Sequence, residues 1–328
     1  MRRIHKKDVV LAVFVTLAMV AVPAHASMVL TAEGTAQGFT LTTFADSFPT
    51  TSTCCGPLGI AFPTSGGVLV SDYPGDTRLF TTDTDNQHAT NFAVAQNFAT
   101  SNGDGLTSLG GKIYMAEQGA GKVVRLNNDG TFNSDIASIS GATAILGDPA
   151  NGLLYVSAPS ASGVFSVNPA THAVNFLIAG APDGLSLDEA HQILYVELGG
   201  QIIGYSIPSA SIVFSSNVIA GGADGTALGS GSIGGNIFVN TNGGTLVEIN
   251  LSTKAQTVIA SGGSRGDFVT PDPNGTLLLT QTDSILRLSA PSGGGFGSGG
   301  SVPEPGTIGM MLSGLIGIAC AVGRRSKA

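Results

Sequence analysis

The chain has 328 residues, of which 42% are hydrophobic and 11% charged, and none is tryptophan. It contains 14 Lys and Arg against 22 Asp and Glu, which gives a formal net charge of −8. Nucleic-acid phosphates require a basic binding face, so this acidic balance argues against a nucleic-acid partner.

The first 26 residues have the composition of an export signal. A basic cluster (Arg2, Arg3, Lys6 and Lys7) precedes an apolar run from Val9 to Val22 and the small-residue site Ala24-His25-Ala26. This order is typical of a signal peptide, so we expect signal peptidase to cleave after Ala26. An uncleaved N-terminal anchor is the alternative.

The body, residues 27–290, repeats one short apolar run six times. The central residues of the runs are Leu69, Tyr114, Tyr155, Tyr195, Phe238 and Leu278, separated by 45, 41, 40, 43 and 40 positions. A shorter strand pattern precedes several of the runs, a further strand pattern follows each of them, and a fourth is visible in two repeats. Four short strands in a unit of about 40 residues predict an all-β, six-bladed β-propeller. A β-helix is the alternative fold.

Closure of the ring requires one more strand. The last repeat reaches only its third strand, at Leu288, and is followed by Gly and Ser residues over 291–301. We expect the segment Phe39–Phe44 to supply the missing outer strand, because pairing of the two chain ends removes an open sheet edge. Residues 291–301 are then a Gly/Ser linker.

The cysteines do not form a disulfide framework. Cys320 lies in the apolar tail, which leaves Cys54 and Cys55 adjacent in the mature chain. Neighbouring cysteines rarely bond to each other because the resulting ring is strained. We expect a vicinal pair in a loop, with strained or intermolecular pairing as alternatives.

The tail, residues 302–328, combines three features in order. Pro303-Glu304-Pro305 is followed by an uncharged apolar run over 306–323 and a basic cluster of Arg324, Arg325 and Lys327. Eighteen residues of helix span about 27 Å, close to the hydrocarbon thickness of a bilayer. The positive cluster should remain cytoplasmic, which places the body across the membrane. A plain C-terminal anchor is the alternative to a processed signal.

This tail closely resembles the PEP-CTERM sorting signal of Gram-negative bacteria. The resemblance implies an inner-membrane-anchored precursor that an exosortase cuts near Pro303, Glu304 and Pro305, so that the protein reaches the cell surface or the medium. Removal of both ends leaves 7 basic and 20 acidic residues, a net charge of −13.

The body also resembles a known group of propellers. Pro182-Asp183-Gly184-Leu185 followed by Ile193-Leu194-Tyr195-Val196 is similar to the NHL, YVTN and SMP-30/gluconolactonase-type repeats. In SMP-30-type lactonases a Glu, an Asn and Asp residues hold a metal, and the resemblance implies that Asp183 corresponds to one of these ligands. The Glu and Asn have no counterparts in 55–58 and 141–144.

Four acids stand at the start of predicted inner strands: Asp104, Asp183, Asp224 and Asp267. Inner strands line the central channel of a propeller, so these carboxylates could converge and hold Ca²⁺, which prefers oxygen ligands. The competing interpretation is that each Asp-Gly forms a tight turn.

The sequence leaves two candidate functions. The sorting signals, the acidic body and the incomplete ligand set favour a non-enzymatic binding module associated with the cell surface or exopolysaccharide. The alternative is a cation-dependent, lactonase-like hydrolase or lyase.

Overall fold

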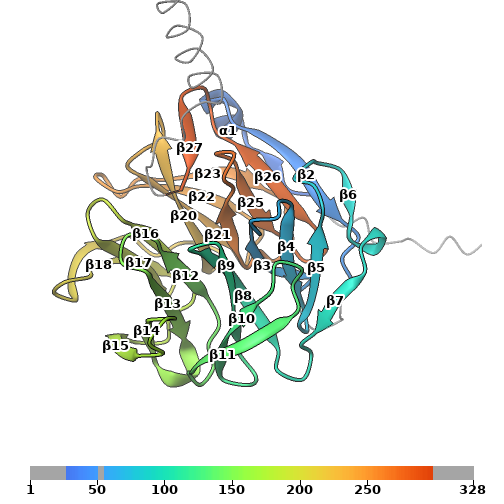
Figure 1. Ribbon diagram of the computed structural model, residues 1–328. Helices are drawn as coiled ribbons and strands as arrows, with labels where there is room; N and C mark the ends of the chain where they lie inside the picture. Colours follow the sequence, from blue (N-terminus) through green and yellow to red (C-terminus); the bar gives the residue numbers. More distant parts are fainter. Residues whose placement is uncertain (1–26, 51–54, 298–328) are drawn as a thin grey trace, which may run out of the picture.

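The computed structural model describes residues 27–50 and 55–297. Its strands form six sheets that follow one another in a ring (Figure 1), and all pairs are antiparallel except the short pair of β2 and β6. The innermost strands contact each other in cyclic order, from β3 through β8, β12, β16, β20 and β24 back to β3. The all-β, six-bladed propeller predicted from the 40-residue period is therefore confirmed.

Four strands form each blade, in order from the channel outward. Blade 1 contains β3 (Pro57–Ala61), β4 (Val68–Asp72), β5 (Asp76–Phe80) and β7 (Val94–Asn97). Blade 2 contains β8 (Gly103–Leu109), β9 (Lys112–Glu117), β10 (Lys122–Leu126) and β11 (Phe132–Ser138). Blade 3 contains β12 (Ile145–Asp148), β13 (Leu153–Ala158), β14 (Gly163–Val167) and β15 (Val174–Ala179).

The remaining blades complete the ring. Blade 4 contains β16 (Leu185–Asp188), β17 (Ile193–Leu198), β18 (Gln201–Ser206) and β19 (Ser211–Ser215). Blade 5 contains β20 (Ala223–Gly231), β21 (Asn236–Thr241), β22 (Leu246–Asn250) and β23 (Gln256–Ser261). Blade 6 contains β24 (Val269–Pro271), β25 (Leu277–Thr280), β26 (Ile285–Ser289) and β2 (Thr40–Asp46).

The repeated apolar runs of the sequence are the second strands of the blades. In β4 all five residues are buried, and in β25 all four are buried. Neighbouring blades cover both faces of these strands, so they read as continuous apolar runs and not as alternating patterns. The outermost strands are largely exposed, as in β7 and β19.

The N-terminal segment closes the ring as expected. Strand β2 pairs antiparallel with β26, with Leu41 opposite Leu288 and Thr43 opposite Leu286. Phe44 is fully buried and lies edge-on to Phe80 of blade 1, with ring centroids 5.4 Å apart. The ring is thus joined by strands from both ends of the chain.

Short elements cover the outer edges of the last two blades. Strand β1 (Val29–Leu30) pairs with β23, and β6 (Gln87–His88) pairs parallel with β2. Helix α1 (Ala32–Gln37) lies between β1 and β2, and two 3-10 turns occupy Ala89–Asn91 and Pro159–Ala161. Within the described ranges, neither α1 nor these turns is long and apolar enough to cross a bilayer.

The propeller extends further than the expected boundary at residue 290. Gly294–Phe296, inside the segment expected to be a linker, forms β27 and pairs with the end of β20. Phe296 is 6% exposed and packs edge-on against Phe238 at 5.0 Å. A single buried aromatic side chain thus orders a segment whose glycines suggested a flexible linker.

We expect the Phe296→Ala substitution to lower the free energy of unfolding by about 3 kcal/mol, the lower end of the range for buried Phe. Urea unfolding followed by circular dichroism measures the change. The Ser292→Ala substitution is the control, because Ser292 is exposed and its neighbour Ser232 bonds to its backbone carbonyl. Equal stability of the two variants would contradict the structural role of β27.

Candidate functional site at the channel mouth

The six inner strands bring six equivalent residues to one end of the channel. They are Leu58, Asp104, Thr143, Asp183, Asp224 and Asp267, and all of them line a cavity of about 240 Å³. We call this end, with its four aspartates, the acidic mouth. The sequence-based expectation that these four acids converge agrees with their positions.

The Asp-Gly pairs of blades 2 and 5 lie inside strands and not in tight turns. Pairing of β8 with β9 and of β20 with β21 shifts register between Gly103 and Leu106 and between Ala223 and Thr226. Each pair therefore occupies a β-bulge, a feature that redirects a side chain. The tight-turn interpretation of these two acids was wrong.

The glycines that follow the aspartates of blades 4 and 5 allow the blades to approach each other. A Cβ atom on Gly184 would lie 2.0 Å from the Asp224 carbonyl oxygen, and one on Gly225 would lie 2.4 Å from that of Asp267. The backbone N–H of Gly225 donates a 2.6 Å hydrogen bond to the same Asp267 oxygen. The glycine of one blade therefore positions the aspartate of the next.

Arg265 supplies a cation among the four carboxyls. Its guanidinium forms an ion pair with Asp267 and lies 4.0 Å from Asp224 Oδ2. It also donates a 2.7 Å hydrogen bond to Asn242 and contacts the sulfur of Cys55. The side chain is 41% exposed, so it reaches the cluster from the solvent side.

One positive charge does not balance four carboxylates. Burial, together with the neighbouring charges of Asp183 and Asp267, raises the pKa of Asp104 and Asp224 well above the usual range. Burial also raises the pKa of Asp183, against the opposing effect of Arg265. For Asp267, burial outweighs the ion pair with Arg265 and raises the pKa to about 6. Burial and mutual repulsion therefore favour the protonated forms of these carboxyls more than water does.

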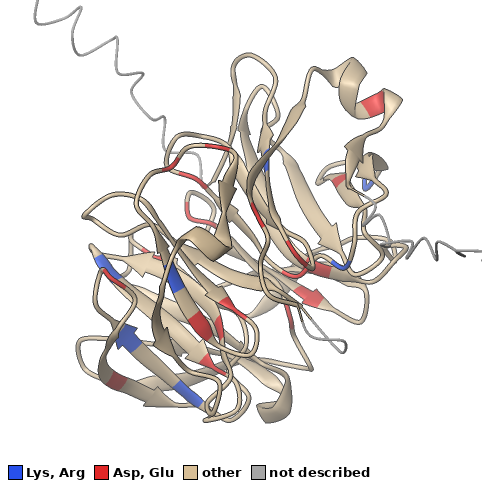
Figure 2. Ribbon diagram, turned by 90° about the vertical axis from the view of Figure 1, so that its right-hand side faces the viewer, with Lys and Arg blue, Asp and Glu red and all other residues tan. Residues whose placement is uncertain are grey.

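Burial also raises the pKa of two further acids, which lie near the ends of second strands. Burial raises the pKa of Glu197 to about 7, although one of its oxygens accepts a 2.7 Å hydrogen bond from the Gly200 N–H. Burial raises the pKa of Asp72 to about 7, against the effect of Arg78. Figure 2 shows that acidic segments occur on several blades, with fewer basic ones between them.

The cavity also contains neutral polar groups that the sequence did not single out. Asn102, Gln118 and Tyr73 line it beside the aspartates, and Gln118 donates a 3.1 Å hydrogen bond to Thr143. Arg265 was equally unassigned, although it stands two residues before Asp267 in the chain. Its proximity to an inner-strand acid is the signal that could have identified it.

The donor set fits a metal ion only in part. Asp224 Oδ2 is buried and accepts no hydrogen bond, which is compatible with a role as a cation ligand. However, in residues 27–50 and 55–297 no three His, Cys, Asp or Glu side chains are arranged to hold a metal together. The guanidinium of Arg265 lies among the carboxyls. Calcium binding by Asp104, Asp183, Asp224 and Asp267 stays a prediction.

Cys55 is disulfide-bonded and lines the same cavity. The two other cysteines, Cys54 and Cys320, lie outside the described residues. The processing residues Ala26, Pro303, Glu304 and Pro305, and the apolar run over 306–323, also lie outside them.

Comparison with known proteins identifies the tail and the fold. Residues 301–327 match the PEP-CTERM protein-sorting motif, so the chain is an exported protein with a membrane-anchored precursor. No curated protein is detectably similar to the chain in sequence. Many solved structures, in contrast, share the propeller architecture.

Three solved structures illustrate this similarity. A gluconolactonase from Xanthomonas campestris is 16% identical, with a TM-score of 0.64 over 82% of this chain and 98% of that one. Streptogramin B lyase is 14% identical, with a TM-score of 0.57 over 77% and 98%. A chain of the nidogen/laminin complex is 12% identical, with a TM-score of 0.54 over 70% and 97%. At these identities the likeness establishes the fold alone.

Proposed function

We propose that the protein is a non-enzymatic binding module of the cell surface or its exopolysaccharide, sorted by an exosortase at Pro303-Glu304-Pro305. Its ligand is a hydroxyl-rich molecule, such as the end of a polysaccharide chain, bound at the acidic mouth. The observation that carries this proposal is the position of the Arg265 guanidinium beside Asp267 and Asp224, where it supplies positive charge that a metal ion would otherwise have to bring.

The chemistry of the cavity supports a sugar-like ligand. Carboxyl, amide and hydroxyl groups from Asp183, Asn102 and Thr143 offer both donors and acceptors to ligand hydroxyls. The volume of about 240 Å³ is near the lower end for small-molecule sites and suits one sugar unit. The excess of acids over Arg265 disfavours anionic ligands.

Calorimetric titration of the mature body with neutral and anionic oligosaccharides tests the proposal. We expect neutral oligosaccharides to bind and sulfated ones to fail. The Asp183→Asn substitution should weaken binding about tenfold, because a hydrogen bond to a charged group contributes about 1.5 kcal/mol or more. The control is Glu33→Gln, which changes an exposed acid on α1. Efficient turnover of lactones or phosphoesters by purified protein would contradict the proposal.

A cation-dependent hydrolase or lyase is the second candidate function, favoured by Asp224 Oδ2, which is buried and accepts no hydrogen bond. Under this alternative, Ca²⁺ binds tightly at one site and raises the melting temperature, and the Asp183→Ala substitution abolishes both effects. Our first proposal predicts no such one-site binding. Titration of the mature body with Ca²⁺ therefore separates the two functions before any substrate is known.

A further inference from the structure

The propeller has a second channel mouth whose chemistry differs from the first. Strand β8 runs from Asp104 at the acidic mouth to Leu109, and the other inner strands run in the same direction. At the far end lies a cavity of about 270 Å³, which we call the apolar mouth. Apolar side chains dominate its lining, in which Glu189 is the one acid; they include Ile60, Leu106, Leu146, Leu185, Leu228 and Val269.

The chain leaves the body at this apolar mouth. Strand β27 pairs with Gly229–Gly231, the last residues of β20. The N–H of Phe296 then donates to the Gly275 carbonyl of blade 6, and that of Gly297 donates to the Leu228 carbonyl of blade 5. Gly297 itself lines the cavity. Residues 294–297 thus fix the exit point of the chain at one face of the propeller.

The connection from this exit to the sorting motif is short. Pro303 is six residues beyond Gly297, and an extended residue spans at most about 3.5 Å, so the reach is about 21 Å. A folded body of about 270 residues has a radius of gyration of roughly 18 Å. A tether of this length, fixed at one face, is too short for the body to present its opposite face to the membrane.

We propose that the apolar mouth faces the lipid surface in the membrane-anchored precursor, while the acidic mouth faces away from it. Charge supports this orientation. Four aspartates line the acidic mouth, whereas Glu189 is the one acid among the residues that line the apolar mouth, so anionic headgroups favour the apolar mouth. The precursor therefore presents its acidic mouth outward before processing, and cleavage at Pro303-Glu304-Pro305 exposes the apolar mouth. The orientation is independent of the ligand proposed above.

Single-tryptophan reporters can test the orientation without background, because the chain has no Trp. Ser65 lies in the exposed turn between β3 and β4 at the apolar-mouth end. Ala120 lies in the exposed turn between β9 and β10 at the acidic-mouth end. The variants Ser65→Trp and Ala120→Trp, as chains of residues 27–328, are placed in vesicles that contain a dansyl-labelled lipid. Only protein that floats with the vesicles is measured.

We expect energy transfer from tryptophan to dansyl to be several-fold stronger in the Ser65→Trp variant. Insertion of 30 Gly and Ser residues after Gly300 is the matched control, because a flexible coil of that length extends about 30 Å and permits rotation. The two signals should then converge, and a difference that persisted would exclude the tether as its cause. Equal transfer with the natural linker, or stronger transfer in the Ala120→Trp variant, would overturn the proposal. The vesicles hold no other protein, so an exosortase cannot produce the result.

Discussion

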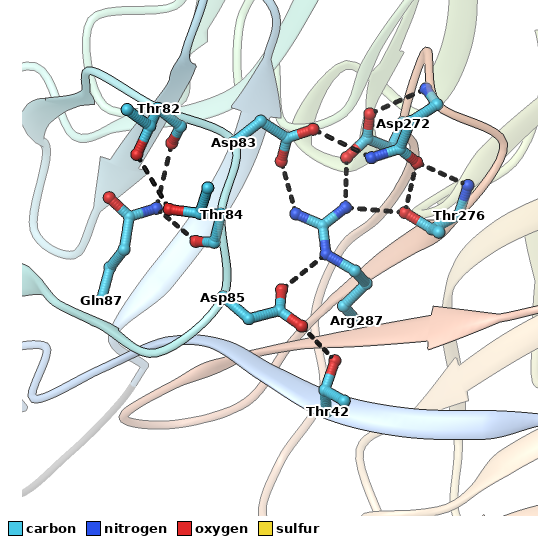
Figure 3. A network of polar contacts seen from close by, with 10 residues as sticks. Thr42, Thr82, Asp83, Thr84, Asp85, Gln87, Asp272, Thr276 and Arg287 are labelled. Atoms are coloured by element: carbon cyan, nitrogen blue, oxygen red, sulfur yellow. Dashed lines mark hydrogen bonds and ion pairs between the residues drawn. The ribbon is translucent and has the colours of Figure 1, made fainter.

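Replacement of Arg287 by Ala is expected to lower the free energy of unfolding by about 3–5 kcal/mol, the range for a buried ion pair that loses one partner. Arg287 lies on β26 at the seam between the last and first blades, and its side chain is 8% exposed. It donates hydrogen bonds of 2.7 Å to Asp85 and 2.6 Å to Asp272, and forms an ion pair with Asp83 (Figure 3). Three carboxylates therefore depend on one guanidinium.

This cluster connects the first and the last blade of the ring. Asp83 and Asp85 belong to the connection between β5 and β6, whereas Asp272 follows β24 of blade 6. The guanidinium carbon of Arg287 also lies 5.3 Å from the ring centroid of Phe44, next to the closing strand β2. Loss of the cation leaves like charges facing each other at the seam, so the first and last blades should separate more easily.

Urea unfolding at pH 7 measures the effect of Arg287→Ala. The control is Lys122→Ala, which removes the exposed ion pair with Asp135 and should leave the midpoint unchanged. Asp272→Asn should offset part of the loss, because it removes one uncompensated carboxylate, and the two substitutions should be non-additive. Equal midpoints for the Arg287→Ala and Lys122→Ala variants would show that the cluster does not hold the seam.

The sequence predicted the parts of the fold that depend on local pattern. Buried second strands leave uninterrupted apolar runs, and the spacing of these runs predicted six blades. The incomplete last repeat predicted the closing role of Phe39–Phe44. The outer strands β7, β11 and β19 were not recognised, because exposed strands retain polar residues and carry no apolar pattern. Strand β27 was missed because its glycines resemble a linker.

The candidate site was predicted only in part, because the repeat pattern places the aspartates but not the residues around them. Convergence of Asp104, Asp183 and their equivalents follows from the repeat. The role of the following glycines does not, since it depends on contact between blades that are about 40 residues apart. The place of Arg265 depends on the path of a loop, which has no repeated counterpart in the sequence. Contacts between residues that are far apart in the sequence therefore determine the parts of the site that the 40-residue period does not predict.

Stability of the mature protein is expected to fall as the pH rises from 5 to 8. The pKa of Asp72 and of Glu197 is raised to about 7 in the folded state, and that of Asp267 to about 6. At pH values between the unfolded and the folded pKa of a carboxyl, the folded state binds more protons than the unfolded state. Stability is therefore greatest at low pH and declines as the pH rises through the folded pKa. Glu197, which is 7% exposed, corresponds alone to roughly 3 kcal/mol.

Urea unfolding in the presence of a chelator, at half-unit steps of pH, measures this dependence. The double substitution Asp104→Asn and Asp224→Asn should raise stability at pH 8 and flatten the profile, since the amides resemble protonated carboxyls. Glu33→Gln on α1 should leave the profile unchanged, because Glu33 is exposed. Stability that increased with pH, or a double variant with the wild-type slope, would show that the carboxyls of the acidic mouth are ionised throughout. Arg265 alone would then have to compensate four negative charges, which one guanidinium on the solvent side cannot do.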